Sequence, residues 1–124
     1  MKLKYLFFGV ALIGLTSFTS DNLDTNYIKA TKVSKTMEQI SDGEKLIAKS
    51  DCVGCHKMDK KLIGPSYLDI AKKYPLNDKN INYLSGKIIK GGSGVWGAIP
   101  MSAHASLKKD DAKSMSKYIL TLKK

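Results

Sequence analysis

Five consecutive residues carry the clearest chemical signal in this sequence: Cys52-Val53-Gly54-Cys55-His56. Two cysteines three positions apart lie on the same side of a helical turn, so both thiols can reach the two vinyl groups on one edge of a porphyrin. The histidine that follows directly would then be carried beneath the iron as an axial ligand. Because C-x-x-C-H is the attachment motif of c-type haem, it predicts one haem bound covalently through Cys52 and Cys55, with His56 as a metal ligand.

Three other uses of a cysteine pair compete with haem attachment. A thioredoxin-like redox pair needs a βαβ context, and no strand-like run precedes Cys52. A zinc site usually takes four nitrogen or sulfur ligands, and the chain offers only the two cysteines, His56 and the distant His104. A plain disulfide between Cys52 and Cys55 is the third alternative in an oxidising compartment. The flanking histidine favours the haem.

The chain has 124 residues, which is the length of one domain. Its start is typical of a secretory signal: Lys2 and Lys4 precede an apolar stretch, Tyr5 to Leu15, that is too short to cross a bilayer. We therefore expect export to the periplasm, with an uncleaved membrane anchor as the alternative. The chain then divides into a signal peptide at residues 1–20, a polar linker or arm at residues 21–40, and a folded domain at residues 41–124.

The charge of the chain is strongly basic and is carried by lysine alone. The formal net charge is +10, and loss of residues 1–20 removes two lysines and no acidic residue, which leaves +8. Such a charge suits nucleic acid, an anionic membrane or an acidic protein partner. Export argues against nucleic acid, and so does the absence of arginine, the usual bidentate binder of phosphate. We expect redox protein partners with acidic docking surfaces. Peripheral membrane association, or lysines that only solvate the surface, fit the same charge.

Start and stop signals for helices recur along the domain, and no alternating strand pattern appears. Ser41 and Glu44 form a capping box, which predicts that a first short helix begins there and runs into Cys52. The remaining signals predict three more helices: one from Ser66 to a stop at Pro75, one capped by Asn77 or Asp78 and ended by Gly91-Gly92, and one from about Lys109 to Leu122. We expect an all-α fold of about four short helices wrapped around one haem.

The segment Gly92-Ser93-Gly94-Val95-Trp96-Gly97 matches the dinucleotide-binding pattern G-x-G-x-x-G. However, it follows a predicted helix rather than a strand, and it runs into Ile99-Pro100, where no helix can start to hold a phosphate. The match therefore does not indicate a nucleotide site.

A haem that only transfers electrons needs a second axial ligand opposite the histidine. The candidates outside the haem motif are Met37, Met58, Met101, Met115 and His104. Met58 is too close to the motif to reach the opposite haem face, Met115 shares the last helix with core residues, and Met37 precedes the first cap. Met101 follows a proline in an irregular, glycine-rich loop, which suits a side chain that must reach around the haem plane. His104 stays open as the alternative.

Together these motifs resemble the bacterial class I cytochromes c, in particular the small ones with a G-x-W-G-x-x-P-M loop. The resemblance covers about Asp42 to Leu122. It rests on Cys52-Val53-Gly54-Cys55-His56, Gly64-Pro65, Gly91-Gly92-Ser93-Gly94-Val95-Trp96-Gly97 and Ile99-Pro100-Met101. It implies the class I cytochrome c fold for residues 41–124, with crossed first and last helices, so that Ile47 meets Met115 or Tyr118.

The resemblance also implies roles for single residues. The carbonyl of Pro65 would orient the imidazole of His56, Trp96 would donate its indole N–H to a haem propionate, and Met101 would be the sixth ligand. The implied function is that of a monomeric periplasmic electron carrier with haem c, not an enzyme. Two alternatives stay open: a fixed haem subunit of a larger oxidoreductase, docked through residues 21–40, and a haem enzyme or sensor with an open sixth site.

Overall fold

Five helices make up the part of the chain that the computed structural model describes, residues 21–122, with side chains described from residue 28 onward. They are α1 (Asp21–Ala48), α2 (Cys52–Cys55), α3 (Tyr67–Lys73), α4 (Asp78–Lys90) and α5 (Lys109–Thr121). Within these residues the only β-type pairing is two isolated bridges, His56 with Lys61 and Gly92 with Met101. The predicted all-α fold class is confirmed. The predicted signal peptide lies outside the described residues.

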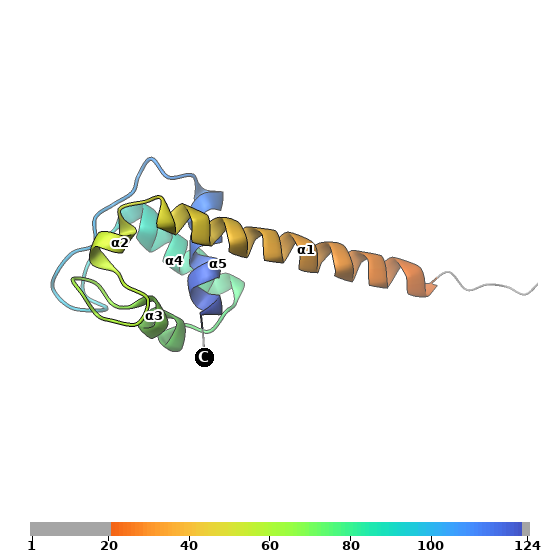
Figure 1. Cartoon of the computed structure of the whole chain (residues 1–124), viewed down its shortest axis with the longest axis horizontal. Helices are drawn as coiled ribbons and strands as arrows, with labels where there is room; N and C mark the ends of the chain where they lie inside the picture. Colours follow the sequence, from red (N-terminus) through yellow and green to blue (C-terminus); the bar gives the residue numbers. More distant parts are fainter. Residues whose placement is uncertain (1–20, 123–124) are drawn as a thin grey trace, which may run out of the picture.

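Helix α5 is the centre of the packing, because α1, α3 and α4 all contact it (Figure 1). Its apolar face joins residues of the other helices in one buried cluster: Ile47, Tyr67, Ile70, Ile88, Ala112, Met115 and Ile119. The crossing with α1 is close at Gly43, where a Cβ would run into the carbonyl of Ser114 and the side chain of Tyr118. The predicted crossing of the first and last helices is therefore confirmed, and Ile47 and Met115 share one core.

The expected start of the first helix at a Ser41 capping box is wrong. Helix α1 runs unbroken through this segment, so Ser41 lies in its interior. Contacts with α5 lie on both sides of Ser41: the Lys117 ammonium donates to the side-chain oxygen of Gln39 at 2.8 Å, and the carboxylate of Glu44 accepts a hydrogen bond from the Tyr118 hydroxyl at 3.2 Å. The glutamate is thus used between helices rather than as a cap, and the first helix is long rather than short.

The segment predicted as a polar linker or arm, residues 21–40, is helical throughout. Figure 1 shows this half of α1 extending away from the other helices. Large apolar side chains on it stay exposed, namely Ile28, Val33 and Met37. The polar character of the segment therefore predicted its exposure but not its helical conformation. The division of the chain at residue 41 stays a prediction.

The other helix ends follow their sequence signals. The hydroxyl of Ser66 accepts a hydrogen bond from the amide of Asp69 at 3.0 Å and caps α3, and the side chain of Asn77 caps α4 in the same way. Helix α4 ends at Gly91, whose φ of 68° is readily adopted only by glycine. Lys108 makes no side-chain cap at the start of α5.

No helix within residues 21–122 combines the length and the apolar character needed to cross a membrane.

Candidate haem site

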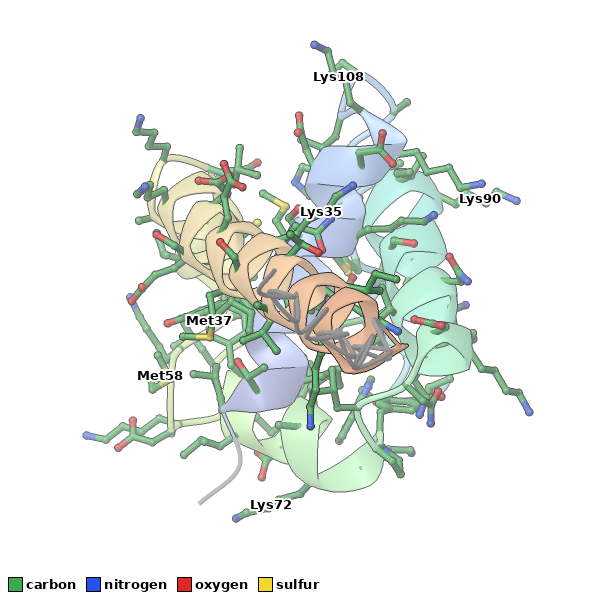
Figure 2. The ribbon with its side chains drawn as sticks, turned by 90° about the vertical axis from the view of Figure 1, so that its right-hand side faces the viewer. Lys35, Met37, Met58, Lys72, Lys90 and Lys108 are labelled. Atoms are coloured by element: carbon green, nitrogen blue, oxygen red, sulfur yellow. The ribbon has the colours of Figure 1, made fainter. Side chains whose placement is uncertain are left out.

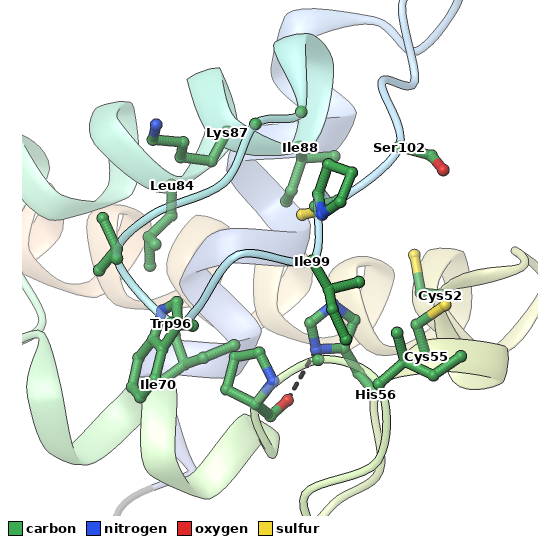
Figure 3. Close-up of a pocket in the computed structure, with 18 of the residues that line it drawn as sticks. Cys52, Cys55, His56, Ile70, Leu84, Lys87, Ile88, Trp96, Ile99 and Ser102 are labelled. Carbon is green, nitrogen blue, oxygen red and sulfur yellow. Dashed lines mark hydrogen bonds between the residues drawn. The ribbon is translucent and has the colours of Figure 1, made fainter.

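A largely apolar cavity of about 370 Å³ lies between the haem motif, helices α3, α4 and α5, and the loop that follows α4 (Figure 3). All six residues predicted for the site line this cavity: Cys52, Cys55, His56, Pro65, Trp96 and Met101. They come from two stretches that are distant in the chain, residues 52–65 and residues 96–101, so the fold itself brings them together. The roles of the individual residues stay predictions.

The imidazole of His56 is held from three sides. Its Nδ1 lies 2.7 Å from the carbonyl oxygen of Pro65, and because a carbonyl only accepts, Nδ1–H is the donor. Tyr67 stacks on the ring at a centroid distance of 5.7 Å. Gly64 completes the cradle, because a Cβ there would occupy the space of the imidazole. With its proton on Nδ1, the ring keeps an unprotonated Nε2 that can bind a metal.

The two cysteines lie on the single turn of α2, and they form no disulfide with each other. The sulfur of Cys52 is half-buried and accepts a hydrogen bond from the Ser50 hydroxyl at 3.0 Å, whereas Cys55 is exposed. The alternative of a zinc site is not supported by the geometry. Among the described residues, the one group of metal-binding side chains within ligand distance is Asp51, Cys52 and His104, and it omits Cys55 and His56.

Met101 is held to the end of α4 by its backbone. It exchanges two hydrogen bonds with Gly92, of 3.1 and 2.9 Å. Gly91 makes this approach possible, because a Cβ on it would meet the Met101 carbonyl. The half-buried Met101 side chain is therefore presented from irregular backbone at the cavity wall.

The other described methionines are placed differently. Met115 also lines the cavity, but it belongs to the core face of α5 and is only 2% exposed. Met37 and Met58 do not line the cavity, and Figure 2 shows both on the outside of the molecule. Met101 as the sixth ligand stays a prediction.

Trp96 lies at the other end of the cavity from the two cysteines (Figure 3). Its ring is partly exposed, and the Lys73 ammonium sits 4.7 Å from the ring centroid, in a cation–π contact that ties the loop to α3. The propionate bond implied for Trp96 stays a prediction.

Two further residues shape the site. Tyr67 has no role predicted from the sequence, and Gly64 is predicted only as part of the Gly64-Pro65 motif, yet both touch the ring of His56. Among described side chains, the hydroxyl of Tyr67 is the one buried polar group without a hydrogen-bond partner. Burial, with smaller effects from Cys52 and Tyr118, raises the pKa of Tyr67 from 10.0 to about 12. The positions of Gly64 and Tyr67 close to Pro65, the residue expected to orient His56, are the signal in the sequence that could have indicated their contact with this ring.

These residues fit a haem c. The site offers two thiols for the vinyl groups, an imidazole with a free Nε2, a thioether, and walls that are mainly apolar. The fold and the site together define a small helical protein that holds one covalently attached haem.

Comparison with known proteins agrees with this description. The sequence profile of the family "Cytochrome c" matches residues 40–123. Cytochrome c-552 of Nitrosomonas europaea is 46% identical over 78 residues, which are 63% of this chain and 76% of the relative. Cytochrome c-551 of Pseudomonas denitrificans is 40% identical over 83 residues, which are 67% of this chain and 100% of the relative.

A solved structure shows the same fold. The crystal structure of wild-type Nitrosomonas europaea cytochrome c552 superposes with a TM-score of 0.60 and 44% identity, over 64% of this chain and 98% of that chain. The chain therefore belongs to the cytochrome c family of small haem proteins that transfer electrons, and it carries one haem c.

Proposed function

We propose that this chain is a one-electron carrier whose haem is joined through Cys52 and Cys55 and ligated by His56 and Met101. The observation that carries this proposal is that one cavity is lined by both thiols, by an imidazole whose Nδ1 is already engaged, and by Met101. When bound, the haem iron supplies the one-electron chemistry, and the protein supplies orientation and electrostatics. Because neutral sulfur favours Fe(II) more than a second imidazole does, a high reduction potential is expected.

His104 is the alternative sixth ligand, and its contacts disfavour that role. It lines the cavity, but its Nε2 lies 2.9 Å from the carboxylate of Asp51 and its Nδ1 lies 3.3 Å from the carbonyl of Ile88. The shorter contact places the N–H on Nε2, which donates to Asp51. Ligation through Nε2 would require this bond to break, whereas Met101 has no polar group to release.

The position of Trp96 supports its proposed contact with a propionate. The vinyl and propionate groups of a haem lie on opposite edges of the ring, and Trp96 lies at the end of the cavity away from the thiols (Figure 3). An indole N–H at that edge would donate to a propionate oxygen.

The proposed setting is the periplasm, and the proposed partners are redox proteins with acidic docking surfaces. The lysine-rich charge supports an acidic partner. Apolar side chains on the cavity rim remain exposed, among them Ile63, Val95 and Ile99. Partner contact at this rim would bring a second redox centre close to the haem. We propose a carrier of this kind, monomeric in solution, rather than an enzyme.

A fixed subunit of a larger oxidoreductase is a second candidate, favoured by one observation. The family profile begins at residue 40, and the part of α1 before it keeps Ile28, Val33 and Met37 exposed. Such a helix would suit docking to a neighbouring protein. Purification followed by light scattering separates the two candidates. A carrier should be recovered from the soluble fraction with the mass of a monomer, whereas a subunit should be recovered from membranes together with stoichiometric partners.

Absorption spectra of the holoprotein with and without reductant test the ligation. Met101→Ala should remove the sulfur-to-iron charge-transfer band of the oxidised protein, lower the potential and admit cyanide, because the sixth position opens. Met58→Ala is the matched control, since this methionine is exposed and outside the cavity. A band that persists in Met101→Ala but disappears in His104→Ala would assign the ligand to His104 instead.

A further inference from the structure

Two segments form the opposite sides of the haem cavity. Residues 51–65, the proximal segment, carry His56, and residues 91–107, the ligand loop, carry Met101. In the described structure, a single hydrogen bond joins these two segments to each other: the bond of 2.9 Å between Nε2 of His104 and a carboxylate oxygen of Asp51. Because a carboxylate only accepts, His104 is the donor.

His104 is in turn anchored to the end of α4. Its backbone amide donates to the carbonyl of Ile88 at 3.1 Å, and its Nδ1 lies 3.3 Å from the same oxygen. Ile88 lies in the last turn of α4, where carbonyls lack partners within the helix. Since Met101 pairs with Gly92 at the same helix end, the stretch from Met101 to His104 is fastened to α4 at both of its ends.

The side chain of Asp51 does not cap the helix that it precedes. It occupies the N-cap position of α2, where an aspartate commonly accepts a hydrogen bond from an amide of the first turn. Its side chain makes no such cap, and the carboxylate bonds to His104, 53 positions further along the chain. The imidazole side chain is only 22% exposed, whereas the carboxylate is 79% exposed. The His104 side of this hydrogen bond is therefore mostly buried, and the Asp51 side lies at the protein surface.

We propose that His104 and Asp51 form a clamp that holds the ligand loop against the proximal segment, and so keeps Met101 in place and small competing ligands out. Any separation of the two sides must break this bond. His104 acts as a positioning residue, through the loop, and not as a ligand. The proposal rests on the proposed function in one respect, the assignment of Met101 as sixth ligand.

The test is the rate at which imidazole binds to the oxidised holoprotein. His104→Ala and Asp51→Ala should each raise the rate about tenfold, the equivalent of one hydrogen bond of about 1.4 kcal/mol. The double variant should bind no faster than the single variants, because both break the same bond. His104→Gln, which keeps a donor, should return the rate toward that of the wild type.

Two controls separate a clamp from a general loss of stability. Asp59→Ala removes an exposed carboxylate of the proximal segment that has no hydrogen bond in the described structure, and its rate should equal the wild-type rate. Gly43→Ala should destabilise the distant crossing of α1 and α5 without changing the rate. Rates in the clamp variants that match Asp59→Ala, or single effects that multiply in the double variant, would overturn the proposal.

Hydrogen exchange gives a readout that does not depend on which residue binds the iron. The amide of His104, which donates to the carbonyl of Ile88, should exchange faster in Asp51→Ala than in the wild type, because loss of the bond to Asp51 leaves this part of the loop held by α4 alone. Unchanged exchange would overturn the clamp. A wild-type protein without the charge-transfer band would overturn the assignment of Met101 alone, and the exchange rates would still decide the clamp.

Discussion

The imidazole of His56 owes its orientation to two neighbours that follow it closely in the chain. The Pro65 carbonyl accepts the Nδ1 proton, and Gly64 leaves the space that the ring occupies. The hydrogen bond selects the tautomer, and the missing Cβ permits the position. A Gly-Pro pair thus performs two different tasks at one ring.

Gly64→Ala should disturb the ring directly. A Cβ at residue 64 overlaps the imidazole, so the ring must tilt and the bond to Pro65 must lengthen. We expect a loss of about 1–3 kcal/mol in the unfolding free energy of the holoprotein, typical of overpacking, together with a shifted reduction potential. Thermal unfolding and redox titration measure both. Gly54→Ala is the control, since nothing lies within 4 Å of a Cβ at that position. Equal effects of the two substitutions would contradict the cradle.

Tyr67 carries a buried hydroxyl without a partner among the described residues, and burial is the main cause that raises its pKa to about 12. Between pH 10 and about 12 the unfolded chain ionises this group while the folded protein does not. The stability that the neutral hydroxyl contributes is therefore complete below pH 10 and is lost as the pH rises through about 12.

Tyr67→Phe should remove this loss and cost little at neutral pH, because the hydroxyl makes no hydrogen bond. Denaturant unfolding at several pH values gives the unfolding free energies of the two holoproteins. The ionisation of the lysines affects both proteins equally, so it cancels in the difference between them. The wild type should weaken relative to the variant only above pH 10. A constant difference across that range would show that Tyr67 ionises normally in the fold.

Helix α1 combines two environments in one element. Its last part packs on α5 through Gly43 and Ile47, whereas its first part extends away and leaves apolar side chains exposed (Figure 1). The family profile includes only the packed part. The part of α1 that lines the haem cavity is its last part, at Ile47.

Gly43→Ala tests the crossing of α1 and α5. The added Cβ meets the carbonyl of Ser114, so the helices must separate, and we expect a loss of about 1–3 kcal/mol in unfolding free energy. The haem spectrum should stay unchanged, since Gly43 does not line the cavity. Thermal unfolding and an absorption spectrum are the measurements. Gly86→Ala, in open space on α4, should not destabilise; an equal loss there would argue against a tight crossing.

The whole molecule presents an excess of lysine, with a formal net charge of +10 for the full chain. Charges of this kind increase the encounter rate with an oppositely charged partner and are screened over about 10 Å at 0.1 M salt. The lysines should therefore affect the rate of electron exchange and not the fold of the protein.

Electron exchange with an acidic redox protein should slow as the salt concentration rises. Stopped-flow rates between 0.01 and 0.1 M salt measure this, because the screening length falls from about 30 Å to about 10 Å over that range. A neutral small-molecule reductant is the control and should react at a constant rate. If the rate with the acidic protein is flat as well, the lysines serve solubility and do not steer partners.

The sequence by itself determined the haem motif, the Pro100-Met101 loop and the starts of α3 and α4. Each of these depends on residues within a few positions of one another, such as the cap that Ser66 forms with Asp69. Because such features depend on local geometry, short stretches of the sequence are sufficient to predict them.

The tertiary structure alone decided what happens between distant segments. It overrode the capping box at Ser41, where α1 contacts α5 on both sides through Gln39 and Glu44, and it paired Asp51 with His104 across the cavity. It also left the Tyr67 hydroxyl without a partner among the described residues. These outcomes depend on which side chains the folded helices bring within contact distance, and no local pattern in the chain encodes that distance.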